Sequence, residues 1–182
     1  VDDPRIRYHP AHTHKGVIPR AGGLSLFFAV LVASLLLIPM NSLFIGILIG
    51  GIILVVVGLL DDRQDVSPYL RLFTNALATL IVVAAGAGIA YITNPISGGV
   101  IHLDYWKISF IFFGEHSIIV WADVFSFLWI MWTMNIVGWS AGVDGQMPGI
   151  VSIAALTLGI LSLRFTQNDP NQISVTIFAF IV

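Results

Sequence analysis

The sequence contains no cysteine and very little charge. Without cysteine, disulfides and thiolate metal sites are both excluded. Only 10% of the 182 residues are charged, whereas about 25% are charged in ordinary soluble domains. The formal net charge of −2 points to no particular partner, and no nucleic-acid partner is expected.

Apolar residues are abundant instead. Hydrophobic residues make up 57% of the chain, and its mean hydropathy is +0.94, so most of the chain is expected to lie in lipid. In lipid, long apolar stretches satisfy their backbone hydrogen bonds as helices, and not as the alternating strands of about 10 residues that form barrels. The sequence therefore predicts an all-α, polytopic transmembrane helical bundle, with residues 1–182 forming one membrane domain.

Five apolar runs are long enough to cross the hydrocarbon core, and part of a sixth begins near residue 173. The five runs cover about 22–39, 41–60, 69–91, 122–138 and 147–163. The loop between the third and fourth runs, at about 92–121, alternates in part around Gly114, which predicts a short β-hairpin over about 108–120. The chain begins at Val1 and stops within an apolar run, which is typical of a fragment.

Lysine and arginine divide unevenly between the two sides that these runs define. Two of them, Lys107 and Arg164, lie on one side. The six on the other side are Arg5, Arg7, Lys15, Arg20, Arg63 and Arg71. Because short cytoplasmic loops carry an excess of Lys and Arg, residues 1–20, 61–71 and 138–146 are predicted to lie on the cytoplasmic face of an inner-membrane protein.

Two adjacent carboxylates, Asp61 and Asp62, end an otherwise uncharged apolar run. Charge is costly near a membrane, so the pair needs a reason. Adjacent aspartates can hold Mg²⁺, with Mn²⁺ as a substitute, while water and substrate phosphates fill the remaining positions of the cation. The structural alternative is a solvated helix end in which Asp62 or Asp65 caps the next turn.

Two other classes of membrane protein also fit an aspartate cluster. Asp61, Asp62 and Asp65 spell D-D-x-x-D, the diphosphate-binding pattern of prenyl synthases and membrane prenyltransferases. That function needs a second acidic cluster, which the remaining sequence lacks. An ion-coupled transporter would carry ionisable groups near the middle of the membrane, where Asn75 is the conspicuous polar residue here.

Two further polar segments adjoin apolar runs on the predicted cytoplasmic side. Residues 14–23 read H-K-G-V-I-P-R-A-G-G, in which Lys15 and Arg20 beside two glycines could cradle a diphosphate or simply set the topology. Residues 135–146 read N-I-V-G-W-S-A-G-V-D-G-Q, in which glycines end the helix and expose backbone amides around Asp144. Taken alone, either segment could be an ordinary loop.

In this order, the three segments resemble the motifs of the polyprenyl-phosphate N-acetylhexosamine-1-phosphate transferase family. The opening segment resembles D-x-P followed by H-K-G-x-x-P-R-x-G-G, and residues 58–68 with Arg71 match the Asp-Asp motif. The third segment departs from N-x-x-N-x-x-D-G-x-D-G, because Gly138 replaces an asparagine and Ala141 replaces an aspartate. A divergent family member without catalytic activity is therefore a further alternative.

The resemblance implies transfer of a sugar 1-phosphate from a UDP-sugar, expected to be a UDP-N-acetylhexosamine, to a polyprenyl phosphate in cell-envelope glycan biosynthesis, with release of UMP. It implies Mg²⁺ on Asp61 and Asp62, one of which would act as a base, and a further catalytic role for Asp144. The implied substrate-binding residues are Lys15, Arg20, Arg71, Asn135 and Gly145. A first helix and C-terminal helices are implied to lie outside this sequence, which is expected to be inactive alone. Membrane lipids and a second copy of the chain, in a homodimer, are further candidate partners.

Overall fold

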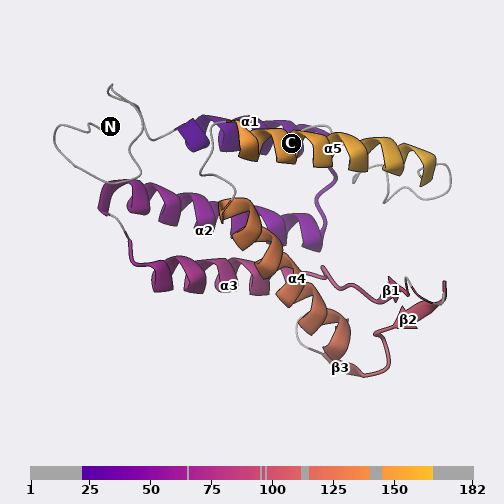
Figure 1. The fold of residues 1–182 in the computed structure, drawn as a ribbon. Coiled ribbons are helices and arrows are strands. Elements are labelled where there is room, and N and C mark those ends of the chain that lie inside the picture. Colours follow the sequence, from indigo (N-terminus) through magenta and orange to yellow (C-terminus); the bar gives the residue numbers. More distant parts are fainter. Residues whose placement is uncertain are drawn as a thin grey trace.

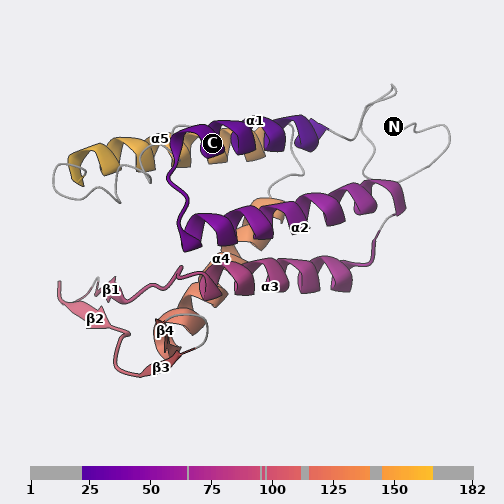
Figure 2. The same cartoon turned by 180° about the vertical axis from the view of Figure 1, so that it is seen from behind.

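The structure is a computed structural model that describes residues 22–64, 66–94, 96, 98–111, 115–139 and 145–165. Three helices, α1 (Gly22–Leu37), α2 (Ser42–Gln64) and α3 (Pro68–Ala84), form a stack, as Figures 1 and 2 show from opposite sides. Their axes are nearly aligned, and successive helices run in opposite directions. The helix α4 (Val120–Trp139) crosses this stack obliquely, and α5 (Gln146–Phe165) follows it. Two β-hairpins separate α3 from α4.

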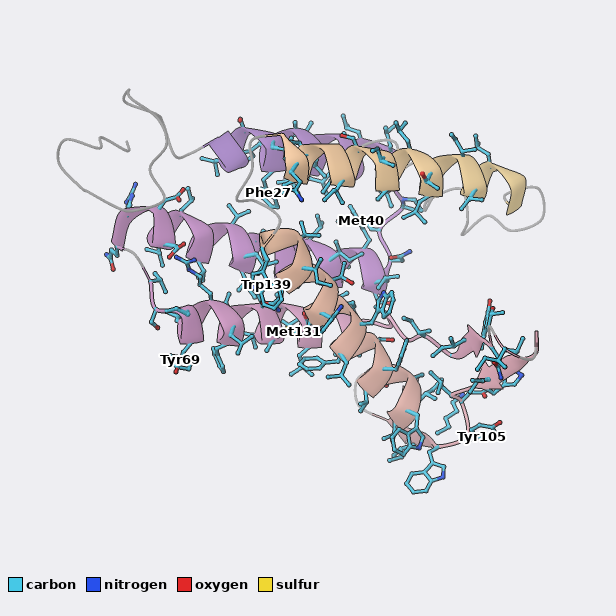
Figure 3. All side chains as sticks on the ribbon, in the orientation of Figure 1. Phe27, Met40, Tyr69, Tyr105, Met131 and Trp139 are labelled. Atoms are coloured by element: carbon cyan, nitrogen blue, oxygen red, sulfur yellow. The ribbon has the colours of Figure 1, made fainter. Side chains whose placement is uncertain are left out.

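A short connection turns the chain back between α1 and α2. Pro39 and Met40 follow the end of α1, and Figure 3 shows Met40 in the bend. The side-chain Oδ1 of Asn41 accepts a hydrogen bond from the backbone N of Phe44 at 2.7 Å, so Asn41 caps α2. The short loop makes α1 and α2 antiparallel neighbours and therefore places the start of α1 beside the end of α2.

Small residues bring α2 against its two neighbours. A Cβ at Gly46 would overlap the side chain of Ala85, and one at Gly50 would lie 3.3 Å from the carbonyl oxygen of Ala78. On the other side of α2, the ring of Phe27 points from α1 toward α2 (Figure 3), and a Cβ at Gly51 would lie 3.3 Å from its Cε2 atom. Glycine at these positions lets helix backbones approach closely, which is how helices commonly associate in membranes.

Hydrogen bonds that involve buried hydroxyl groups attach α4 to α3 and to the segment that follows α3. Ser126 is fully buried on α4, where its Oγ accepts from the backbone N of Ile89 at 2.7 Å and donates to the carbonyl of Ala122 at 2.7 Å. The hydroxyl Oγ1 of Thr79 on α3 donates a hydrogen bond to the sulfur of Met134 on α4 at 3.6 Å. These contacts fix where α4 crosses α3.

The predicted third span is too long. Helix α3 ends at Ala84 and not at residue 91, and Gly86 adopts a φ of 114°, which an α-helix cannot contain. The chain then forms β1 (Tyr91–Thr93), which pairs antiparallel with β2 (Val100–His102). The sequence did not predict this first hairpin.

The second hairpin confirms the hairpin predicted over about 108–120. Strands β3 (Lys107–Ile111) and β4 (Glu115–Ile119) pair antiparallel, with Lys107 opposite Ile119. The backbone N of Val120 then donates to the carbonyl of Trp106 at 3.0 Å, which joins this hairpin to the start of α4. Figure 3 shows Tyr105, which is 75% exposed, at the end of the molecule away from the helix stack.

The mainly helical fold is confirmed, whereas the full set of five spans stays a prediction. Within the described part of the chain, α2 and α4 have the length and composition to cross a membrane. The apolar helical segments Gly23–Leu37, Pro68–Ala84 and Gln146–Leu161 are shorter. Large apolar side chains are exposed along all five helices, for example Leu36 and Ile153. Such surfaces suit lipid or further helices.

Candidate functional site

The antiparallel stack gathers three helix ends on one side of the molecule. Figure 1 places the start of α1, the end of α2 and the start of α3 together, with the hairpins at the opposite end. Arg63 and Arg71 lie at the first end, whereas Lys107 is on a hairpin and Arg164 is near the far end of α5. These four residues therefore lie at two opposite ends of the molecule, and their division between two sides of a membrane stays a prediction. Which side faces the cytoplasm stays a prediction.

A pocket of about 280 Å³ opens between the start of α1 and the last turns of α2. Its lining residues are Gly23 and Leu24 of α1 and Val55, Gly58, Leu59, Asp61 and Asp62 of α2. The pocket therefore brings together Gly23, which ends the first motif (residues 14–23), and both carboxylates of the second motif (residues 58–68). Leu24, Val55 and Leu59 form its apolar side, and Asp61 and Asp62 lie toward the end of α2.

The apolar lining of this pocket was not predicted from the sequence. Val55, Leu59 and Asp62 are spaced four and three residues apart, so they share one face of α2 with Gly58 close by. That spacing is a detectable signal. Within a uniformly apolar helix, however, it cannot be told from a face that contacts lipid.

The carboxylate of Asp61 organises the turn between α2 and α3. Its Oδ1 atom accepts a hydrogen bond from the backbone N of Val66 at 2.9 Å. The same oxygen accepts from Nε of Arg71 at 3.0 Å and from Nη2 of Arg71 at 2.8 Å. The Asp61 side chain is 23% exposed, and the Arg71 side chain is 56% exposed. Arg71, which was predicted to bind phosphate, is thus paired with Asp61.

Helix α3 begins with a cap of its own. The backbone N of Leu70 donates to Oγ of Ser67 at 3.4 Å, and Pro68 occupies the first turn. Ser67 is therefore the N-cap of α3. Capping of the turn before α3 by Asp62 stays a prediction. Asp65 lies outside the described residues.

The electrostatic surroundings of the aspartate pair favour a bound cation. Asp61 and Asp62 lie in the last turn of α2, where the helix dipole is negative and interacts unfavourably with carboxylates. The two neighbouring carboxylates also repel each other. Arg71 offsets part of this negative charge, and a cation in the pocket would offset more.

The donor groups at the pocket suit Mg²⁺. Carboxylate oxygens are its preferred protein ligands, and it commonly uses only one or two of them, together with water and substrate phosphates. Within the described ranges, no cluster of three or more histidine or acidic side chains could enclose a metal. Asp61 and Asp62 could therefore hold Mg²⁺ or Mn²⁺ only with ligands from phosphate, water or other parts of the protein.

The third motif is described only in part. The amide Nδ2 of Asn135 donates to the carbonyl of Met131 at 2.7 Å, and Asn135 does not line the pocket. Its neighbour Met134 contacts Thr79, which lies eight residues along α3 from Arg71, or roughly 12 Å at 1.5 Å per residue.

Gly145 precedes α5 with a φ of 80°, a conformation that favours glycine. Its carbonyl accepts from the backbone N of Gly149 at 3.1 Å, which begins the helix. Lys15, Arg20 and Asp144 lie outside the described residues. Their assigned roles, and those of Asn135 and Gly145, stay predictions.

Comparison with known proteins gives several similar sequences, all of them transferases. A probable undecaprenyl-phosphate N-acetylglucosaminyl 1-phosphate transferase of Bacillus subtilis is 25% identical over 90% of this chain. An undecaprenyl-phosphate alpha-N-acetylglucosaminyl 1-phosphate transferase of Yersinia pestis is 30% identical over 99% of it. A phospho-N-acetylmuramoyl-pentapeptide-transferase of Campylobacter lari is 29% identical over 86% of it.

The chain spans 40%, 43% and 45% of the lengths of these three relatives, respectively. No solved structure is significantly similar to it. The family model described as glycosyl transferase family 4 matches residues 44–182, a region that contains the aspartate pair, Arg71 and the third motif. This match confirms the resemblance found in the motifs, and the chain belongs to glycosyl transferase family 4.

Proposed function

We propose that the whole protein transfers a sugar 1-phosphate from a UDP-sugar to a polyprenyl phosphate and releases UMP, as a step in building cell-envelope glycans. The donor is proposed to be a UDP-N-acetylhexosamine. The observation that carries the proposal is the pocket in which Asp61 and Asp62 meet Gly23, the last glycine of the first motif. A pocket lined partly by apolar side chains and partly by two carboxylates suits a lipid whose phosphate is bound through a cation.

The proposed reaction requires positioning and charge neutralisation more than covalent chemistry by the protein. An oxygen of the acceptor phosphate attacks the phosphorus atom that carries the sugar, and the bond from that phosphorus to UMP breaks. Mg²⁺ held by Asp61 and Asp62 would supply positive charge to the phosphates. One aspartate would accept any proton on the acceptor phosphate, and Arg71 holds Asp61 in place.

The remaining candidate residues are proposed to bind charged or polar parts of the substrates. Lys15 and Arg20 precede Gly23 in the first motif, so their positive charges could act on phosphate near the pocket. Asn135, near the end of α4, and Gly145, just before α5, are proposed to bind the donor. Asp144, between the two helices, is proposed to act in catalysis.

A second candidate function is a family member that binds lipid phosphate without catalysis. Gly138 and Ala141 favour it, because both replace polar residues of the third motif. The D-D-x-x-D prenyltransferase is less favoured, because the matched family is a glycosyl transferase family.

An assay of UMP release distinguishes these functions. The full-length protein, purified in detergent, should release UMP from at least one UDP-sugar, with UDP-N-acetylhexosamines the best donors. Release should require both polyprenyl phosphate and Mg²⁺, and EDTA should abolish it. A folded protein that releases no UMP with any donor in the panel, yet binds polyprenyl phosphate, would support the non-catalytic alternative.

The protein is proposed to cross the inner membrane several times, with the aspartate pair on the cytoplasmic face. It is proposed to be a monomer or a homodimer. These 182 residues contain no cysteine, so a thiol introduced among them is a defined target once any cysteines elsewhere in the whole protein are replaced. In intact cells, an impermeant thiol reagent should label Tyr105→Cys. It should label Gln64→Cys and Gln146→Cys only after the membrane is permeabilised. Labelling of these two variants in intact cells, with Tyr105→Cys protected, would reverse the proposed orientation.

A further inference from the structure

The two oxygens of the Asp61 carboxylate are used unequally. Oδ1 accepts all three hydrogen bonds that reach this side chain from described residues, one from Val66 N and two from Arg71. A carboxylate oxygen offers about two lone-pair positions, so these three donors fully occupy Oδ1. Among the described residues, none donates to Oδ2, and Asp61 lines the pocket together with Asp62.

This inequality determines how Asp61 can bind a cation. A cation that binds through both oxygens must displace the Arg71 guanidinium from Oδ1, whereas one that binds through Oδ2 alone leaves it in place. Mg²⁺ requires near-octahedral geometry at about 2.0–2.1 Å and suits single-oxygen binding, whereas Ca²⁺ accommodates 6–8 ligands and often binds carboxylates through both oxygens. The hydrogen bonds from Arg71 therefore oppose the arrangement that favours Ca²⁺.

We propose that Arg71 is a positioning residue that restricts Asp61 to single-oxygen binding and thereby makes the site select Mg²⁺ or Mn²⁺ over Ca²⁺. The proposal rests on the proposed function, because it takes Asp61 and Asp62 to be the cation ligands. In this role Arg71 acts on Asp61, a ligand of the metal, and not on a substrate phosphate. Val66 supports the same arrangement through its backbone N, which holds Oδ1 toward the turn.

Removal of Arg71 would have two separable effects. The loss of a positive charge near the pocket should strengthen binding of every cation, because the charge repels them. The loss of the two hydrogen bonds should in addition free Oδ1, which benefits Ca²⁺ more than Mg²⁺. Arg63 is a matched control, because it lies in the last turn of the same helix and is exposed, and no hydrogen bond joins it to Asp61.

Binding of Mn²⁺ to the full-length protein in detergent, followed by electron paramagnetic resonance without substrate, measures these effects. Competition with Mg²⁺ and Ca²⁺ then gives the preference for Mg²⁺ as a ratio of dissociation constants. Arg71→Gln should lower this preference by roughly tenfold, which is comparable to the smallest changes in metal affinity that follow loss of a ligand's hydrogen-bond partner. Arg63→Gln should leave the ratio unchanged, and Arg71→Lys, which keeps the charge and one donor group, should restore part of it.

The controls separate failure of this proposal from failure of the proposed function. If Asp61→Asn abolishes Mn²⁺ binding but Arg71→Gln changes the ratio no more than Arg63→Gln does, the positioning role of Arg71 is wrong and the metal site stands. If Asp61→Asn and Asp62→Asn both leave Mn²⁺ binding unchanged, the metal site and the positioning role are both wrong.

Discussion

Replacement of either Asp61 or Asp62 by asparagine should lower sugar 1-phosphate transfer by about a hundred- to a thousandfold. Each change removes one negative charge with little change of shape. Loss of one preorganised electrostatic group typically costs on the order of 3–4 kcal/mol of transition-state stabilisation. The measurement is UMP release by the full-length protein at saturating Mg²⁺, UDP-sugar and polyprenyl phosphate.

The two variants need a control for folding, because Asp61 also holds the turn between α2 and α3. Asp61→Asn weakens the hydrogen bonds with Arg71 and Val66, so its thermal unfolding should be compared with that of Asp62→Asn. Asp104→Asn is the matched control for charge, since Asp104 is exposed between β2 and β3 at the opposite end of the molecule. It should keep nearly full activity.

Asp65→Asn distinguishes the transferase from the D-D-x-x-D alternative. If the first two aspartates alone serve the metal and the acceptor phosphate, this variant should retain most of its activity. An equally severe loss in all three variants would instead favour the diphosphate-binding pattern of prenyltransferases. Full activity in all three would contradict the proposed role of the pair.

The positions of the helices were largely predictable because length and hydropathy determine them. The runs expected at 41–60 and 122–138 correspond to α2 and α4, and only their ends shift by a few residues. The end of α3 was missed for a physical reason. Gly86 lies in a run of alanine, glycine and isoleucine that stays apolar, so hydropathy does not change there, whereas the backbone conformation does.

The candidate site was predictable only as far as its residues carry charge. Asp61 and Asp62 stood out because charge at the end of an apolar run is rare. The pocket beside them was not predictable, because Leu24 and Val55 are brought together by the packing of α1 on α2. The contact between Arg71 and Asp61 was missed for a similar reason. It joins residues ten positions apart and depends on the turn that Ser67 and Val66 shape.

The second large effect is expected at Gly58, which keeps the pocket open by lacking a side chain. Gly58 lines the pocket, and a Cβ built on it would meet no atom within 4 Å. A Cβ can therefore be placed there without a clash, and the side chain of a larger residue is expected to take up pocket space that the substrate needs. Misplacement of a substrate by about 1 Å can cost on the order of a hundredfold in rate, and Gly58→Leu should lower transfer by about that factor.

A graded series at this position separates blockage of the pocket from damage to the fold. Gly58→Ala should raise thermal stability slightly, because alanine is favoured over glycine in a helix by up to about 1 kcal/mol, and should lower activity only modestly. Gly58→Leu should keep that stability while its KM for polyprenyl phosphate rises or its kcat falls. Gly149→Leu is the matched control, because a Cβ at Gly149 also meets no atom within 4 Å and this residue lies on α5 outside the pocket. If Gly58→Leu were as active as Gly149→Leu, the pocket between α1 and α2 would not be where the substrate binds. A loss of activity accompanied by equal unfolding would assign Gly58 to packing instead.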